Sequence, residues 1–207
     1  MKVLLVNGSP NAHGCTDAAL QIAAAALEEN GVETEIFWIG SRPIGGCIGC
    51  GGCRAGAGCV LEGPVNDFVE KAAAADGFIF GSPVHYAAAS GNLTSFLDRV
   101  FFSAPKDVFR LKPGAAVVSA RRAGTTAALE QLNKYMGISE MPLISSCYWN
   151  MVHGSKAEDV KKDEEGVRIL RTLGNNMAYF LKCRQAARQA GIELPKPEPR
   201  VMTNFIR

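Results

Sequence analysis

Short apolar runs alternate with amphipathic helical patterns along this chain, and that alternation constrains its fold more than any other feature. Residues 3–6 are apolar, and residues 16–29 then place Leu20, Ala24 and Leu27 at helical spacing. Strands that alternate with helices form βαβ units with right-handed crossovers and a parallel sheet. We therefore predict a doubly wound α/β fold, with a five-stranded parallel sheet and helices on both faces. The expected strands are 3–6, 33–38, 77–80, 115–119 and 142–146, and the expected helices are 16–29, 66–75, 93–101, 125–135 and 164–189.

The domain organisation follows from the length and from two departures from a minimal fold. The 207 residues suit a single domain, residues 1–207. Residues 40–64 are predicted to form a long cysteine-rich loop, and residues 147–163 an insertion after the fifth strand. In doubly wound sheets the ligand lies beyond the carboxyl ends of the strands, where the strand order reverses. Three glycine-containing segments follow expected strands at that edge.

Charge and hydropathy argue against several classes of protein. The net charge is only +2, without a long basic run, so we expect no nucleic-acid partner. The apolar runs are too short for a membrane span, and residues 2–6 are too short for a secretory signal. Four of the seven cysteines crowd into residues 47–59, which in a reducing compartment indicates metal or redox chemistry more than disulfides. We expect a cytoplasmic protein that does not bind a membrane.

The loop after the first expected strand, residues 8–16, has the features of a phosphate site. Free backbone N–H groups, the positive end of a helix dipole and the hydroxyls of Ser9 and Thr16 would meet a phosphate there. The loop has no lysine and lacks the Gly-x-Gly-x-x-Gly pattern, so the Walker A and dinucleotide interpretations both fail. A single phosphomonoester, as in FMN, fits better; the alternative is a plain turn in which Thr16 caps the helix. The predicted phosphate-site residues are Ser9, Pro10, Asn11, Gly14, Cys15 and Thr16.

Two further loops are predicted to hold the flavin ring. Residues 82–86 follow the third strand and can lay backbone amides and an aromatic side chain along a flat ring, where N–H donors tune the flavin potential. Residues 119–124 follow the fourth strand, and one arginine there could face the flavin O2 or a dinucleotide phosphate. The alternative for His85 or Tyr86 is an aromatic residue that anchors the loop. The alternative for Arg121 or Arg122 is an arginine that faces solvent. The predicted residues are Ser82, Pro83, Val84, His85, Tyr86, Ser119, Arg121, Arg122 and Gly124.

Read together, the three loops resemble those of the NAD(P)H-dependent FMN reductase group of flavodoxin-like proteins. Cys15 stands where the group usually has the asparagine of Gly-Asn-Thr, and His85 stands where it often has tyrosine. The resemblance implies non-covalent FMN, electron or hydride transfer at flavin N5 without a catalytic protein residue, and a homodimer or homotetramer. It covers nearly all of residues 1–185 and rests on Gly8-Ser9-Pro10 with Gly14 and Thr16, on Gly81-Ser82-Pro83-Val84 followed by Ser95-Phe96-Leu97-Asp98-Arg99, and on Arg122-Ala123-Gly124.

A second chemical signal is the cysteine spacing Cys47-x₂-Cys50-x₂-Cys53-x₅-Cys59. Four thiolates this close in sequence can surround one [4Fe–4S] cluster, and the intervening glycines let the chain bend around it. The arrangement resembles that of the iron–sulfur flavoproteins, a branch of the same group in which the cluster passes single electrons to FMN. Three alternatives are open: a zinc site, a redox dithiol of Cys50 and Cys53, and a loop that binds nothing.

Cys15 is singled out by its position at the start of a helix. A helix N-terminus lowers the pKa of a thiol, so we expect a lowered pKa for Cys15 unless the FMN phosphate covers it.

These features favour an FMN-dependent oxidoreductase. We expect it to take electrons from NAD(P)H or a ferredoxin-type donor and to pass them to a quinone, oxygen or a similar small-molecule acceptor. The alternatives are a non-enzymatic flavin or iron–sulfur electron carrier and a flavin-binding regulatory or structural module. Carriers of the flavodoxin type are strongly acidic, so the net charge of +2 favours the enzyme.

Overall fold

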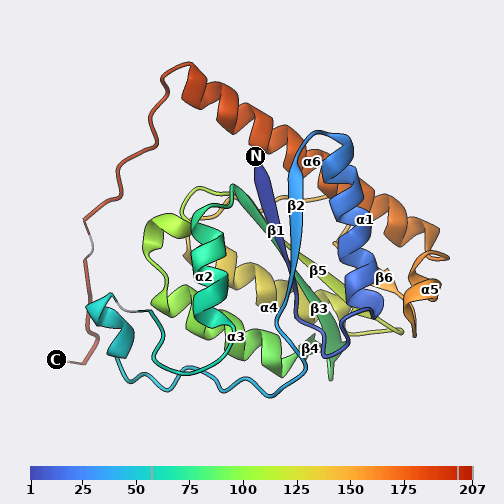
Figure 1. Ribbon diagram of the computed structural model, residues 1–207, viewed down its shortest axis with the longest axis horizontal. Helices are drawn as coiled ribbons and strands as arrows, with labels where there is room; N and C mark the ends of the chain where they lie inside the picture. Colours follow the sequence, from blue (N-terminus) through green and yellow to red (C-terminus); the bar gives the residue numbers. More distant parts are fainter. Residues whose placement is uncertain (57, 200, 207) are drawn as a thin grey trace.

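The computed structural model describes residues 1–56, 58–199 and 201–206, and it confirms the predicted parallel α/β sheet. Five parallel strands follow the order β2-β1-β3-β5-β6, and a short strand β4 pairs antiparallel with β3 (Figure 1). The strand order reverses between β1 and β3, which is where a doubly wound fold binds its ligand. The strands are β1 (Lys2–Asn7), β2 (Glu33–Trp38), β3 (Gly77–His85), β4 (Ala88–Ala89), β5 (Gly114–Ala120) and β6 (Met151–His153). The α-helices are α1 (Cys15–Glu29), α2 (Val65–Ala73), α3 (Gly91–Ser103), α4 (Thr125–Ile138), α5 (Ala157–Val160) and α6 (Glu164–Gln189), and two 3₁₀ helices are η1 (Gly52–Ala55) and η2 (Lys106–Val108).

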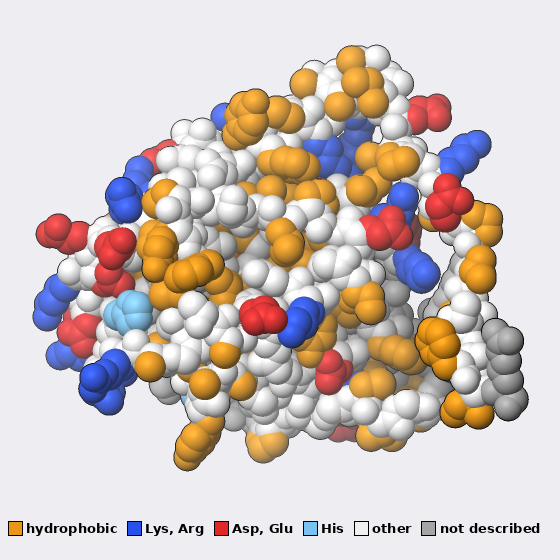
Figure 2. All heavy atoms as spheres, turned by 180° about the vertical axis from the view of Figure 1, so that it is seen from behind, with side chains coloured by type: hydrophobic (Ala, Val, Ile, Leu, Met, Phe, Trp, Pro, Cys, Tyr) orange, Lys and Arg blue, Asp and Glu red, His pale blue; other side chains and the backbone are white. Residues whose placement is uncertain are grey.

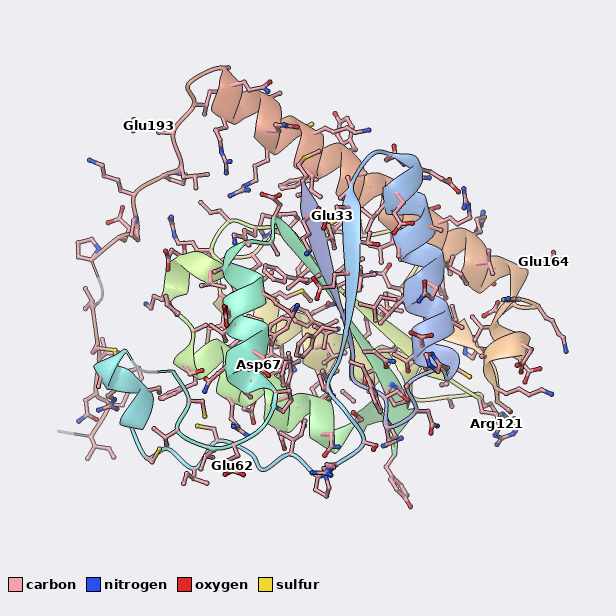
Figure 3. All side chains as sticks on the ribbon, in the orientation of Figure 1. Glu33, Glu62, Asp67, Arg121, Glu164 and Glu193 are labelled. Atoms are coloured by element: carbon pink, nitrogen blue, oxygen red, sulfur yellow. The ribbon has the colours of Figure 1, made fainter. Side chains whose placement is uncertain are left out.

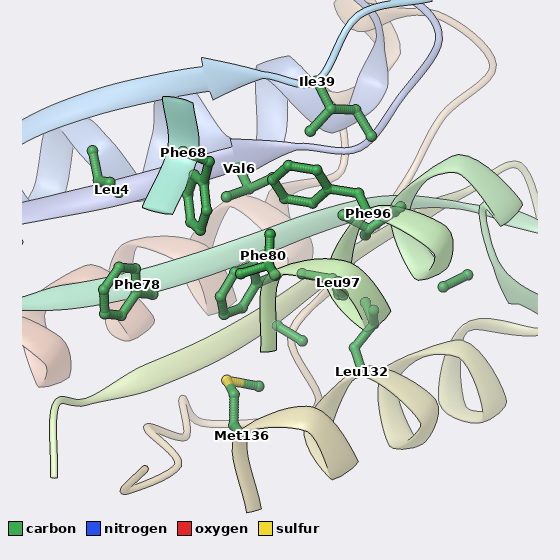
Figure 4. Close-up of a cluster of buried hydrophobic side chains, with 14 of the residues drawn as sticks. Leu4, Val6, Ile39, Phe68, Phe78, Phe80, Phe96, Leu97, Leu132 and Met136 are labelled. Atoms are coloured by element: carbon green, nitrogen blue, oxygen red, sulfur yellow. The ribbon is translucent and has the colours of Figure 1, made fainter. Parts of the chain in front are cut away.

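Strand β1 is apolar from Val3 to Val6 because helices cover both faces of the sheet, which is the usual reason for a continuous apolar run in a strand. Successive side chains of a strand point to opposite faces. Val3 and Leu5 accordingly pack with residues of α1 and α6. Leu4 and Val6 pack on the other face with residues of α2, α3 and α4, and Figure 4 shows several of these side chains meeting over β1 and β3.

Helix α3 illustrates how the sequence pattern positions an element. Its residues Leu93, Phe96, Leu97 and Val100 are fully buried at helical spacing, as their periodicity predicts. Ser90 caps the helix, since its Oγ accepts a hydrogen bond from the Leu93 N–H at 3.3 Å. The same hydroxyl donates to the Gly8 carbonyl at 2.7 Å, so the start of α3 is tied to the loop after β1.

The predicted fifth strand at 142–146 was wrong in position. Leu143 is the residue of that segment that makes a bridge, to Gly114. The fifth strand of the parallel sheet is β6, which begins later, at Met151. Met151 and Val152 are buried and pair with the end of β5, whereas residues 145–149 loop outward and expose polar and aromatic side chains. The predicted insertion at 147–163 therefore does not follow the strand: β6 lies inside it, and α5 occupies its second half.

After α6 the described residues 192–199 and 201–206 have no regular secondary structure and run back towards η1 (Figure 1). The space-filling view in Figure 2 shows apolar side chains along this exposed tail, and a mixture of acidic and basic side chains gathered at the opposite edge, near α5. Within the described part of the chain, none of the helices combines the length and apolar character that crossing a membrane requires.

Candidate functional site

Three loops meet at the carboxyl ends of β1, β3 and β5. The strand register places Asn7 beside Gly81 and Pro83 beside Ser119, so the segments that follow these residues share one edge of the sheet. They enclose an open cleft of about 680 Å³ at the switch point. The cleft is lined by Ser9, Pro10, Asn11, Ala12, His13, Gly14, Cys15, Thr16, Pro83, Val84, His85, Ser119, Ala120, Arg121, Gly154, Ser155, Lys156, Ala157 and Glu158.

The loop after β1 is held open by side-chain hydrogen bonds. The buried Asn7 accepts from the Ser9 N–H and donates to the Ala12 carbonyl, both at 3.0 Å. The Ser9 hydroxyl accepts from the Asn11 N–H at 3.1 Å, and the indole of Trp38 donates to the Ser9 carbonyl at 2.8 Å. These contacts fix the backbone of the loop beside the start of α1.

Helix α1 begins at Cys15, and no side chain caps it. The N-cap residue is Gly14, which has no hydrogen-bonding side chain, so the first N–H groups of α1 lack a side-chain acceptor. The alternative in which Thr16 acts as the cap is therefore wrong. Thr16 lies inside the first turn and is buried, and its Oγ1 lies 2.9 Å from the hydroxyl oxygen of Ser119. Uncapped N–H groups at a helix N-terminus attract an anion such as phosphate.

The second loop differs from its prediction because β3 continues through His85 instead of ending at Gly81. Pro83, Val84 and His85 line the cleft, but Ser82 does not. The Ser82 hydroxyl is buried, accepts from the Ser90 N–H at 2.9 Å and donates to the Pro83 carbonyl at 2.8 Å. The Ser82 hydroxyl therefore ties β3 to the start of α3 and does not line the cleft.

Tyr86 also lies outside the cleft lining. It forms, with Ala87, the two-residue turn between β3 and β4, since His85 pairs with Ala88 across the hairpin. Both turn residues have positive φ, 49° for Tyr86 and 59° for Ala87, which fits a type I′ turn and strains residues other than glycine, asparagine and aspartate. The Tyr86 side chain is fully exposed.

In the third loop Ser119 and Arg121 line the cleft, whereas Arg122 and Gly124 do not. Figure 3 shows Arg121 projecting at the end of the sheet near α5. Gly124 is the uncapped N-cap of α4, with φ of 87°. A Cβ at this position would lie 2.7 Å from the Ala87 Cα and 3.0 Å from Val84, so glycine lets the hairpin pack against the start of α4.

The sequence patterns missed the fourth wall of the cleft, which is formed by residues 154–158. This segment joins β6 to α5, and it was not expected here because the fifth strand was predicted too early. Asp159 holds it in place, because its carboxylate accepts from the N–H groups of Ser155 at 3.2 Å and Lys156 at 3.3 Å. Lys156 adds a cation to the cleft. The sequence would have indicated this residue only if the fifth strand had been placed at Met151–His153, because Lys156 then follows a strand end at the ligand-binding edge of the sheet.

The predicted lowering of the Cys15 pKa was wrong. Burial raises the pKa of the Cys15 thiol, and the nearby carboxylates of Asp159 and Glu158 raise it further. The Cys15 Sγ lies 3.5 Å from the Gly154 carbonyl oxygen. Glu158 belongs to the missed fourth wall and Asp159 directly follows it, which explains why the helix position alone predicted the wrong direction.

The cysteine-rich loop forms a second, separate site. Cys47, Cys50, Cys53 and Cys59 line one small cleft together with Arg99. None of these residues lines the first cleft, and Figure 1 places η1, which contains Cys53, at the end of the molecule opposite α5.

Two asparagines anchor the cysteine-rich loop. The Asn66 side chain accepts from the Cys59 N–H at 2.9 Å and donates to the Cys59 carbonyl at 2.8 Å. At the other end, Asn92 accepts from the Ile44 N–H at 3.1 Å and donates to the Arg42 carbonyl at 3.0 Å. The ends of the loop are therefore fixed, whereas Gly49, Gly51, Gly56 and Gly58, all with positive φ, shape its middle.

The four cysteines are not arranged for a single metal ion. All are free thiols, and no group of three or more metal-binding side chains in the described residues is close enough to hold one ion. Zinc would need four sulfurs about 2.3 Å from one point, whereas a cubic cluster separates its four thiolate ligands more widely. The cleft that the four cysteines share is small, with a volume of about 20 Å³.

Comparison with known proteins agrees with this architecture. Residues 1–156 match the family described as NADPH-dependent FMN reductase. An iron–sulfur flavoprotein of Methanocaldococcus jannaschii is 30% identical over 192 residues, which cover 88% of this chain and 98% of the relative. Among solved structures, RosB bound to a riboflavin-phosphate intermediate has a TM-score of 0.69 at 16% identity, covering 100% of this chain and 94% of that one. An archaeal flavodoxin has a TM-score of 0.58 at 16% identity, covering 88% and 99%.

The sheet order and the cleft at the switch point define a flavodoxin-like α/β protein. The chain belongs to the NADPH-dependent FMN reductase family. Its resemblance to the iron–sulfur branch of that family is supported by the similarity to the archaeal iron–sulfur flavoproteins.

Proposed function

We propose that this chain is an FMN-dependent oxidoreductase that accepts electrons from NAD(P)H or a ferredoxin-type donor and passes them to a quinone, oxygen or a similar acceptor. The observation that carries the proposal is the cleft at the carboxyl ends of β1, β3 and β5, bordered by the N-terminus of α1, which has no side-chain cap. Membership in the FMN reductase family supports the same chemistry.

In this proposal the FMN phosphate binds at the start of α1. The uncapped first turn of α1 offers the backbone N–H groups of Cys15 and Thr16 there. Ser9, Asn11 and Gly14 line the same space, and the Thr16 hydroxyl lies beside Ser119. A set of backbone N–H donors and hydroxyls at a helix N-terminus suits a phosphate monoester, which carries its negative charge on three oxygens. Pro10 and Cys15 complete the wall of the phosphate site.

The flavin ring is proposed to lie between the end of β3 and the end of β5. Pro83, Val84 and His85 would border one side, and Ser119 and Arg121 the other. Arg121 would place a positive charge near the flavin O2 or a dinucleotide phosphate, where charge tunes the flavin potential. Tyr86, Arg122 and Gly124 would act at the rim, through the hairpin and the start of α4, without lining the cleft.

Bound FMN would supply the redox chemistry, accepting or donating a hydride or single electrons at N5. The chain's own residues bind and orient it, and we assign no catalytic nucleophile. Lys156, in the fourth wall, is proposed as an additional cation for a phosphate in the cleft.

The second site is proposed to hold one [4Fe–4S] cluster on Cys47, Cys50, Cys53 and Cys59. Its support is the convergence of all four cysteines on one cleft and the similarity of the chain to the archaeal iron–sulfur flavoproteins. Such a cluster supplies one-electron transfer. Because its cleft is separate from the first, a flavin and iron–sulfur electron carrier is the second candidate function.

We further propose a homodimer or homotetramer in a reducing compartment, the cytoplasm. All seven cysteines are free, as a reducing environment requires. Tyr148 and Trp149 pack edge to face, with ring centroids 4.7 Å apart, on the outward loop before β6, and each is about half exposed, so they suit an interface between subunits.

The deciding experiment is anaerobic mixing of the purified, FMN-loaded protein with NADH or NADPH in a stopped-flow spectrometer. Rapid bleaching of the flavin absorbance is the expected result for the reductase. If neither dinucleotide bleaches the flavin but a reduced ferredoxin does, the donor is a ferredoxin; if none of the three does, the enzyme proposal fails. An iron and sulfide assay on anaerobically prepared protein tests the cluster independently, because protein with flavin but no iron would remove the cluster and leave the reductase.

A further inference from the structure

The side chain of Arg99, on α3, is buried beneath the cysteine-rich loop and directs its donors at that loop. Only 2% of the residue is exposed. Its Nε donates to the Cys59 Sγ at 3.3 Å, and one terminal nitrogen donates to the Gly45 carbonyl at the same distance. The other terminal nitrogen donates to the carbonyls of Leu61 and Glu62, the latter at 2.9 Å.

These contacts join the two ends of the loop. Gly45 precedes Cys47, and Leu61 and Glu62 follow Cys59, so one guanidinium holds the backbone on both sides of the four cysteines. The planar fork of an arginine makes several such bonds at once, which a lysine cannot reproduce. Arg99 is therefore placed to set the position of the Cys59 sulfur.

The buried positive charge of Arg99 has no carboxylate partner within 4 Å among the described residues. Its neighbour Asp98 instead accepts from the Tyr135 hydroxyl at 2.5 Å. Arg110 and Arg171, which are more exposed, both pair with glutamates. A buried charge is costly unless an opposite charge or a set of hydrogen bonds compensates for it, and the acceptors of Arg99 are three neutral carbonyls and one sulfur.

We propose that Arg99 is a positioning residue for Cys59 and provides the positive charge that balances an anionic iron–sulfur cluster, thereby raising the reduction potential of that cluster. This inference rests on the proposed cluster of the four cysteines. Four thiolates give the oxidised site a net negative charge, and adding one electron makes it more negative. A buried cation beside one thiolate therefore stabilises the reduced form more than the oxidised form, and an N–H donor to the sulfur acts in the same direction.

The test compares the full-length protein with Arg99→Lys and Arg99→Gln, all prepared and reconstituted anaerobically. Arg54→Gln is the matched control, because Arg54 lies in η1 next to Cys53 and is exposed. FMN content and thermal melting report whether each variant folds. Iron and sulfide per chain report cluster loading, and an EPR-monitored redox titration gives the potential.

We expect the cluster potential to fall in both Arg99 variants, further in Arg99→Gln because the charge itself is lost, and to stay unchanged in Arg54→Gln. Loss of iron from Arg99→Gln with full FMN content also supports the positioning role. Full loading with an unchanged potential in both Arg99 variants overturns the proposal. If the wild-type protein takes up no iron, the proposed cluster itself is wrong. This result is distinguishable from failure of the Arg99 proposal because it is seen in the wild-type protein alone.

A second measurement does not depend on the folding of any variant. Wild-type protein grown with ¹⁵N-labelled arginine should show ¹⁵N coupling to the reduced cluster in pulsed EPR, because the Arg99 Nε contacts the Cys59 sulfur. Absence of that coupling in a fully loaded protein would overturn the direct contact.

Discussion

Thr16 Oγ1 and Ser119 Oγ lie 2.9 Å apart, and this contact joins the start of α1 to the end of β5 inside the cleft. Both residues are buried although both are polar, and they come from the two loops proposed to hold opposite ends of FMN. A phosphate at the start of α1 would therefore meet a hydroxyl that is already oriented by its neighbour.

Replacing Thr16 by valine removes that hydroxyl and keeps the side-chain shape. The loss of one hydrogen bond to a charged group, about 1.5 kcal/mol, should weaken FMN binding roughly tenfold. Thr16→Ser should retain the affinity, and Thr16→Glu should abolish FMN retention because a carboxylate repels the phosphate. Titration of apoprotein with FMN, followed by flavin fluorescence, measures these constants. Thr172→Val, on α6 away from the cleft, is the control, and equal affinity of Thr16→Val and wild type would contradict the phosphate placement.

Gly124→Ala should destabilise the protein and loosen the hairpin between β3 and β4. The added Cβ would meet the Ala87 Cα at 2.7 Å, and the φ of 87° disfavours alanine. Together these effects should cost about 3 kcal/mol in the free energy of unfolding, with weaker FMN binding as a consequence of the displaced hairpin. Urea unfolding and FMN titration check both parts. Gly91→Ala, where a new Cβ meets nothing within 4 Å, should change neither quantity measurably; equal losses in the two variants would show that packing is not the cause.

Ala87→Gly should stabilise the protein, because Ala87 has a φ of 59° that glycine adopts without strain. Relief of the left-handed conformation, less the greater entropy of glycine in the unfolded chain, should yield roughly 0.5–1 kcal/mol. Ala186→Gly, in the exposed part of α6, should have the opposite sign and cost roughly 0.5–1 kcal/mol. Thermal melting of the two variants side by side measures the contrast. A lower melting temperature for Ala87→Gly would mean that the turn is not strained.

Cys15 should react slowly with iodoacetamide at neutral pH, because burial and the neighbouring acids raise the pKa of its thiol. The thiolate is the reactive form, so the rate should rise as the pH passes above the ordinary thiol range. Glu158→Gln removes one of the acidic charges and should shift the pH profile of the rate downward. Alkylation of FMN-free protein followed by peptide mass spectrometry gives the rate, with the exposed Cys147 as the internal reference. Faster labelling of Cys15 than of Cys147 at pH 7 would contradict the raised pKa.

The fold class and most of the helices and strands could be predicted from the residues alone. The apolar periodicity of residues 93–101 predicted α3, and the helix expected at 164–189 matches α6 at both ends. These predictions succeed because burial of an apolar face against a neighbour imposes a period that is visible in the residues themselves. The phosphate loop and the cysteine cluster were likewise visible, because their residues are close together in the chain.

Which residues face the cleft, and which charges lie close together, depends on how the segments pack in three dimensions. Ser82 turns to Ser90, Tyr86 projects into solvent, and the segment 154–158 forms a wall that no local pattern indicated. The same holds for the raised pKa of Cys15, which depends on acids more than 140 residues away, and for Arg99 beneath Cys59. Local patterns report the period of burial, whereas a site depends on which segments the sheet order brings together, and that order arises only when the strands pair.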